Sequence, residues 1–227
     1  MFRSWQAVLW LLAAALAASL VARVVPFARA QLQHGEGGAS VDTGLRLSEV
    51  LAGPARDWDG DGAYDSRKDE WLELVNTGAA PLDLTPFRVA DIDSTIRFEL
   101  SGTLQPGAAL LVTGGMAEAQ QRALGRTVTG LSLNNTGDAV IVFRVDGADT
   151  VRVDGRRYTG IEGATDRSTG WMNDPSVWVL FDKFNPYSGS GEPKGTGCAP
   201  TPGQRNGCPS PASETSWGKI KQMYLGR

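Results

Sequence analysis

The residues best suited to chemistry lie in one short acidic segment of the 227-residue chain. Its carboxylates take positions 1, 3, 5 and 9 of a run with glycine at position 6, which is the spacing that opens an EF-hand calcium loop. The acids are Asp57, Asp59, Asp61 and Asp65. Alternate residues on a tight turn point their carboxylates inward, and Gly62 permits the bend that brings the Ala63 carbonyl to the ion. This pattern predicts a calcium site.

The end of the segment departs from that pattern. Position 12, normally a bidentate glutamate, is Lys68, and Asp69 and Glu70 follow it directly. One of these two would complete the metal shell if the loop is a residue or two longer. No pair of helices flanks the loop, so the ion would staple the fold and would not act as a sensor. The alternative is an acidic, solvated turn, because Asp and Gly favour turns on their own.

Catalytic patterns are absent from the sequence. His34 is the single histidine and lies in a polar, Gly-rich segment at residues 31–44, so neither a zinc site nor a His-dependent triad can be assembled. Glu70 and Glu73 could imitate a glycosidase pair, but strand alternation puts them on opposite faces. No phosphate-binding glycine loop and no Gly-x-Ser-x-Gly elbow appear. The sequence predicts no catalytic residue and no organic cofactor.

Cys198 and Cys208 are the two cysteines, in a segment rich in Gly and Pro. Two thiols without a histidine or further cysteines make a poor zinc site, and the Cys-x-x-Cys spacing of a redox pair is missing. A structural disulfide is therefore predicted. Closing so short a loop stabilises a fold by roughly 2–3 kcal/mol on the chain-entropy model.

The first thirty residues form an export signal. Arg3 is followed by an uncharged apolar run at residues 7–22, and Ala28-Arg29-Ala30 is a small-x-small cleavage pattern. The alternative is a retained membrane anchor, although sixteen apolar residues fall short of the ~20 that span a bilayer. Export places the cysteines in an oxidising compartment. The expected location is outside the cell, at its surface or in the periplasm.

Removal of residues 1–30 makes the net charge of the chain more negative. The formal net charge of the whole chain is −3, and the removed segment holds three arginines and no acid, so the remaining chain carries −6. General nucleic-acid binding needs clustered Lys and Arg that displace counterions from phosphate. Nucleic acid is therefore not an expected partner.

The remaining chain has the pattern of an all-β protein. Short alternating runs are separated by Gly and Pro, which indicates an antiparallel β-sandwich. The runs lie at residues 45–51, 71–75, 82–89, 95–100, 108–113, 139–145 and 149–153. Asp146-Gly147 predicts a hairpin, Gln105-Pro106-Gly107 predicts a strand–turn–strand unit, and residues 117–124 form the one helical stretch. Residues 178–181 are expected to add a last strand.

The chain ends in a basic, amphipathic tail. The predicted organisation is a signal peptide at 1–30, a linker at 31–44, a sandwich domain at 45–208, and a linker with the tail at 209–227. Trp217, Ile220 and Tyr224 recur at helical spacing with basic residues on other faces, so a short helix is plausible. Such a tail either packs on its own sandwich or recognises a surface partner, and its membrane affinity would be weak.

Nine short motifs, in one order along the chain, carry a family resemblance. They lie at residues 47–50, 69–76, 82–84, 87–89, 104–107, 133–138 and 154–158, followed by Thr201-Pro202-Gly203 and Asn206. This ordered set resembles the lamin-tail domain in its bacterial, secreted form, over about residues 45–208. The resemblance implies an immunoglobulin-like β-sandwich with no known catalytic centre. In nuclear lamins this domain mediates protein contacts, and in bacteria it occurs on exported proteins, often beside hydrolase domains.

These observations predict an exported, non-catalytic module that binds or builds at the cell surface and is stabilised by calcium. The expected partner is a protein or another component of the envelope. Membrane contact is expected only through a retained N-terminal segment or weakly through the tail. The alternative is an accessory factor in extracellular nucleic-acid handling, or a hydrolase that uses a metal in the acidic loop.

Overall fold

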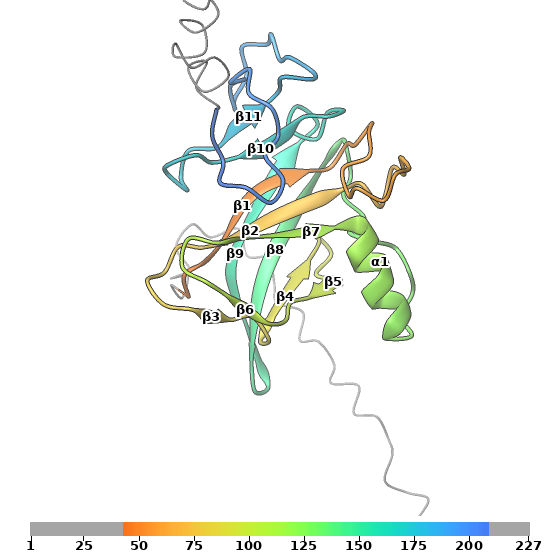
Figure 1. Ribbon diagram of the computed structural model, residues 1–227, viewed down its shortest axis with the longest axis vertical. Coiled ribbons are helices and arrows are strands. Elements are labelled where there is room, and N and C mark those ends of the chain that lie inside the picture. Colours follow the sequence, from red (N-terminus) through yellow and green to blue (C-terminus); the bar gives the residue numbers. More distant parts are fainter. Residues whose placement is uncertain (1–42, 209–227) are drawn as a thin grey trace, which may run out of the picture. The chain divides into compact units, whose positions relative to one another are not determined.

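The computed structural model describes residues 43–208, which form a five-stranded sheet, a four-stranded sheet, a two-stranded ribbon and one helix (Figure 1). The first layer is a five-stranded sheet in the order β11-β10-β1-β2-β7. Its strands are β1 (Leu45–Leu51), β2 (Trp71–Asn76), β7 (Ala109–Thr113), β10 (Ser168–Gly170) and β11 (Val179–Phe181). The predicted signal peptide, linker and tail lie outside the described residues.

The second layer is a four-stranded sheet in the order β5-β4-β8-β9. Its strands are β4 (Phe87–Ala90), β5 (Ile96–Glu99), β8 (Gly137–Asp146) and β9 (Asp149–Thr159), and a two-stranded ribbon pairs β3 (Leu82–Asp83) with β6 (Thr103–Leu104). Asp146 pairs with Asp149, so the hairpin predicted from Asp146-Gly147 is confirmed. Figure 1 shows this hairpin projecting beyond the other strands.

Apolar side chains from both layers fill the space between the sheets. Leu47, Leu74 and Val112 of the first sheet belong to the same buried cluster as Val89 and Val142 of the second. Alternation along each strand directs these residues to one face, which is the arrangement of a sandwich core. The all-β antiparallel sandwich predicted from the sequence is confirmed.

A β-bulge in β1 decides which residues of this strand enter the core. Leu47 lies opposite Leu74, but Glu49 lies opposite Glu73, so Ser48 is an extra residue in β1. The bulge lets Leu47 and Val50 both join the core, although they are three residues apart. Simple alternation would have placed Glu49 among the apolar side chains of the core.

The strands predicted on either side of Gln105-Pro106-Gly107 are present as β5 and β7, but they belong to different sheets, because β5 pairs with β4 and β7 pairs with β2. The short strand between them, β6, pairs with β3. The chain crosses between sheets at this point. The helix α1 (Gly114–Ala123) follows β7 directly and begins three residues earlier than predicted, because the Thr113 side chain accepts a hydrogen bond from the Met116 N–H and caps it.

Among residues 43–208, the one α-helix, α1, is too short and too polar to cross a bilayer.

Candidate metal centre

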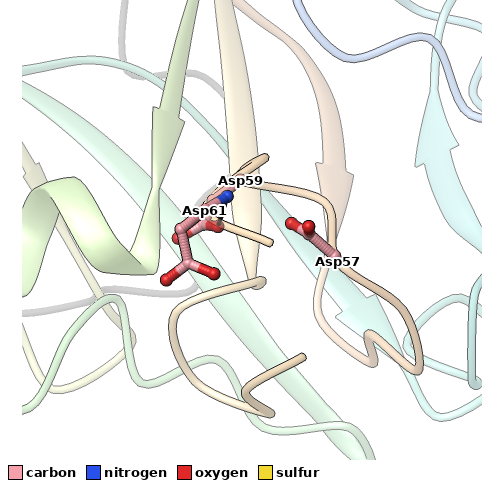
Figure 2. Close-up of side chains that lie close together, drawn as sticks. All are labelled: Asp57, Asp59 and Asp61. Atoms are coloured by element: carbon pink, nitrogen blue, oxygen red, sulfur yellow. Dashed lines mark hydrogen bonds between the residues drawn. The ribbon is translucent and has the colours of Figure 1, made fainter. Parts of the chain in front are cut away.

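The acidic segment lies in the loop that joins β1 to β2, close to the start of α1 (Figure 1). Asp57, Asp59 and Asp61 each offer one carboxylate oxygen, and these oxygens all lie within 4.8 Å of one another. Figure 2 shows Asp57 facing Asp59 and Asp61 from the other side of the loop. Asp57 and Asp61 are exposed and Asp59 is half-buried. The structure therefore brings together the first three of the predicted calcium ligands.

Hydrogen bonds from the loop's own backbone hold these carboxylates in position. The Gly60 and Gly62 N–H groups donate to the two oxygens of Asp57, at 2.7 and 2.9 Å. The Asp61 N–H donates to the Asp59 carboxylate, and the Ala63 N–H donates to the Asp61 carboxylate. Gly60 and Gly62 have φ values of +78° and +90°, which side chains with a Cβ rarely adopt. The acids and glycines of the segment thus specify the turn together.

Asp69 organises the loop from its inner side. It is fully buried, and its Oδ1 accepts hydrogen bonds from the Trp58 and Asp59 N–H groups at 2.6 and 2.9 Å. Its Oδ2 accepts one from the Asp65 N–H at 2.7 Å. Three backbone donors from both halves of the loop therefore converge on one carboxylate, which fixes where Asp59 stands.

The other predicted ligands have different surroundings. The Asp65 carboxylate accepts from the backbone N–H groups of Arg67 and Lys68, and these bonds lower its pKa. Glu70 is buried and accepts a hydrogen bond from the Leu133 N–H at 3.1 Å. Asp69 and Glu70, which were predicted to close the metal shell, are therefore directed to backbone groups and not toward the three clustered oxygens.

Electrostatic repulsion is concentrated at Asp59. Partial burial raises the pKa of this carboxyl, and the nearby carboxylates of Asp61, Asp69 and Asp57 raise it further. The ammonium of Lys68 lies 3.9 Å from the Asp61 Oδ2, and both side chains are about two-fifths exposed, so the pair is screened by water and contributes little. A bound cation would relieve this repulsion among like charges.

The start of α1 holds the second half of the loop. The Gly114 N–H donates to the Glu70 carbonyl at 2.7 Å, and the Gly115 N–H donates to the Lys68 carbonyl at 3.0 Å. A Cβ on Gly115 would stand 2.7 Å from the Asp59 Oδ2. The glycine pair therefore lets the helix and the acidic loop approach more closely than residues with side chains would permit.

An aromatic and ionic cluster holds the first half of the loop, and sequence reasoning missed it. The Trp58 indole N–H donates to Asp166 at 3.0 Å, and the Arg56 guanidinium pairs with the same carboxylate at 3.0 Å. The Trp58 ring packs at 6.2 Å from the buried Trp71 ring, and Arg56 lies 3.9 Å over the ring of Phe184. Asp166 is about 100 residues away in the chain, so no local pattern could have found this partner.

The predicted disulfide is confirmed. Cys198 and Cys208 are bonded, with Cα atoms 5.3 Å apart. The bond closes a loop of the predicted length, so the expected stabilisation stays at roughly 2–3 kcal/mol.

Comparison with known proteins gives the family. The family model described as Lamin Tail Domain matches residues 39–160, which is more than half of the chain. No curated protein matches the chain, and no solved structure does. β10 and β11 lie beyond the matched range, although β10 pairs directly with β1 inside it. The sandwich and the matched segments agree with the resemblance read from the sequence: this chain belongs to the lamin tail domain family and has its immunoglobulin-like fold.

Proposed function

We propose that this protein is an exported, non-catalytic lamin-tail module that binds a partner or has a structural role at the cell surface or outside the cell, and that calcium stabilises it. The observation that carries the proposal is the gathering of three carboxylates in the loop between β1 and β2. The loop is held at both ends by buried contacts, so an ion bound there would stabilise the sandwich and not drive a large movement.

The donor set fits calcium by its chemistry. Asp57, Asp59 and Asp61 supply only carboxylate oxygens, which are the ligands that hard divalent cations prefer. Two of the three carboxylates are exposed, which leaves them open to an ion and to water. Among residues 43–208, these three are the one group of acids, histidines or cysteines close enough to share a metal. The Ala63 carbonyl remains a proposed further ligand.

Calcium is expected to raise the melting temperature of the mature protein. An ion at one hundred times its Kd adds about 2.7 kcal/mol, which is about 5–10 °C for a domain of this size. Asp59→Asn with Asp61→Asn removes two of the three ligands and is expected to abolish the increment. The measurement is thermal unfolding, followed by tryptophan fluorescence, with calcium and with chelator.

The matched control is Asp93→Asn with Asp149→Asn, which removes the same charge from exposed positions away from the loop and should keep the full increment. An identical melting temperature in calcium and in chelator would contradict the calcium site. Nicking of plasmid DNA by the calcium-loaded protein, lost in the double loop variant, would favour the metal-dependent hydrolase instead.

Export is supported by the N-terminal sequence and by the disulfide, which persists in oxidising compartments. We expect material recovered from outside the cytoplasm to begin at Gln31. N-terminal sequencing or intact mass decides this, and a retained Met1 would indicate the membrane-anchor alternative. A partner would then be sought by pull-down from the native cell envelope.

A further inference from the structure

Two glutamates are buried side by side on the outer face of the five-stranded sheet. Glu49 of β1 lies directly opposite Glu73 of β2, and the two are 0% and 1% exposed. Side chains at directly opposed positions share a face, with Cβ atoms typically about 5 Å apart. Two like carboxyl groups at this distance, out of contact with water, are a costly arrangement that the surrounding structure must maintain.

A disulfide-closed segment covers this pair, and we call residues 198–208 the strap. The Thr201 N–H and hydroxyl donate to the Glu49 carboxyl at 3.2 and 2.6 Å. The Asn206 amide donates to the carbonyls of Ser48 and Trp171 at 2.9 and 2.8 Å. The strap is therefore held to the sheet by a few polar contacts, and Glu49 is the acceptor for one end of it.

The pair has few compensating charges. Ser168 also donates to Glu49, and the Ser48 hydroxyl donates to the Glu73 Oε1 at 2.7 Å, while the Glu73 Oε2 has no hydrogen-bond partner. Within the described part of the chain, no cation forms an ion pair with either glutamate.

Charged groups also lie on the elements around the pair. Arg46 lies on β1 opposite Val75, Arg205 of the strap is exposed and lines the cavity beside Glu73, and the Asp182 carboxylate accepts from the N–H groups of Tyr187 and Gly197. Burial raises the pKa of Glu49 to about 7, the hydrogen bonds from Ser168 and from Thr201 of the strap partly offset this rise, and the Glu73 carboxylate adds a smaller increase. Burial also raises the pKa of Glu73 to about 7, partly offset by the Ser48 hydroxyl and by the strap's backbone N–H groups.

A cavity of about 270 Å³ lies beside the pair, and the strap forms one of its walls. Glu73 and Val75 line it from the sheet, Trp171 lines it from the segment after β10, and Arg205 and Asn206 line it from the strap. Any movement of the strap away from the sheet would therefore change the shape of this cavity and admit water to the carboxyl pair.

We propose that the strap is a proton-controlled flap, which lies closed on the sheet while Glu49 and Glu73 are protonated and swings open at the cavity when they ionise. The disulfide joins the two ends of the strap to each other, and the Lys183 N–H, which donates to the Cys198 carbonyl at 2.9 Å, holds the Cys198 end beside β11, so the opening is local. This proposal does not depend on the calcium site.

The direction in which pH changes the closure of the strap follows from proton linkage. If opening returns a carboxyl group to water, its pKa falls to the ordinary value of 4.5, whereas burial in the closed state raises the pKa to about 7. Closure is therefore strongest below about pH 4.5 and weakens as the pH rises to 7. For one carboxyl, the ratio of open to closed molecules rises by up to about 300-fold across this window.

Tryptic cleavage after Arg205 tests the flap, because a protease needs a locally opened chain. The nick falls inside the disulfide loop, so it appears as two fragments only after reduction. For the full-length protein we expect the rate of this nick to rise at least tenfold between pH 5 and pH 8, after division by the rate for a short unstructured Arg peptide. Mass spectrometry identifies the cut.

Glu49→Gln and Glu73→Gln remove one titrating group each and keep the side-chain shape, so each should reduce the pH dependence; Asp93→Asn should leave it unchanged. Hydrogen exchange at the Thr201 amide of the unmodified protein, corrected for intrinsic pH dependence, gives an independent measurement should a variant fail to fold. Equal corrected rates at both pH values would overturn the proposal. An unaltered pH dependence in both Gln variants would also overturn it.

Discussion

Gly114→Ala is expected to destabilise the protein by at least about 3 kcal/mol, at the upper end of the range for overpacking. A Cβ at this position would stand 1.8 Å from the Arg67 carbonyl oxygen and 3.1 Å from the Lys68 Cα. Both atoms belong to the backbone, so no side-chain rotation can relieve the clash. The direction of this change in stability is informative, because alanine in a helix is otherwise favoured over glycine by about 1 kcal/mol.

The clash cannot be relieved cheaply by moving the loop either. The Gly114 and Gly115 N–H groups donate to the Glu70 and Lys68 carbonyls, so a shift of residues 67–70 breaks two hydrogen bonds at a buried helix start. The measurement is the urea midpoint followed by tryptophan fluorescence. Gly207→Ala is the matched control, because a Cβ there meets no atom within 4 Å, and it should leave the midpoint unchanged.

Gly115→Ala separates the effect on the acidic loop from the effect on the fold. Its Cβ would meet the Asp59 Oδ2, which is the end of a side chain and can move. We expect a smaller loss of stability than for Gly114→Ala, together with a displaced Asp59 carboxylate. A Gly114→Ala variant as stable as the unmodified protein would show that the loop can leave the helix at little cost.

The fold could be predicted where the signal is local. Asp146-Gly147 identifies its hairpin because an Asp-Gly turn matches the twist of two flanking strands. The turn at Pro106-Gly107 is an equally clear local signal, and the strands predicted on either side of it are present, but β5 and β7 belong to different sheets. A turn sequence specifies a reversal of the chain and not the partners of the strands beside it. β10 was missed since its three residues are buried through pairing with β1 and β11, not through their own pattern.

The candidate site likewise has a part that local spacing predicts and a part that depends on distant residues. Asp57, Asp59 and Asp61 come together because two-residue spacing on a tight turn is enough to gather them. The position of Asp69 depends on backbone donors from both halves of the loop, and that of Glu70 depends on Leu133, more than sixty residues away. The burial of Glu49 depends on a bulge at Ser48 and on a strap about 150 residues later. Such long-range contacts leave no mark on local spacing.

Trp71→Ala is expected to cost about 3–5 kcal/mol, the usual range for removing a fully buried large aromatic side chain. Trp71 is 0% exposed and lies on the face of β2 opposite Leu72, under the loop that carries Trp58. Its ring is the packing partner that joins this loop to the sheet. The loss is therefore expected both in global stability and in local protection of the loop.

Trp71→Phe is the variant that distinguishes packing from hydrogen bonding. The Trp71 indole N–H is buried without a hydrogen-bond partner, so replacing it by phenylalanine removes an unsatisfied donor along with part of the ring. We expect Trp71→Phe to cost less than about 1.5 kcal/mol in urea unfolding followed by circular dichroism. A cost equal to that of Trp71→Ala would mean that the indole N–H has a partner in solution. Hydrogen exchange completes the test: the Trp58 and Asp59 amides, which donate to Asp69, should exchange faster in Trp71→Ala and stay protected in Trp71→Phe, because the ring of Trp71 supports the half of the loop in which they lie.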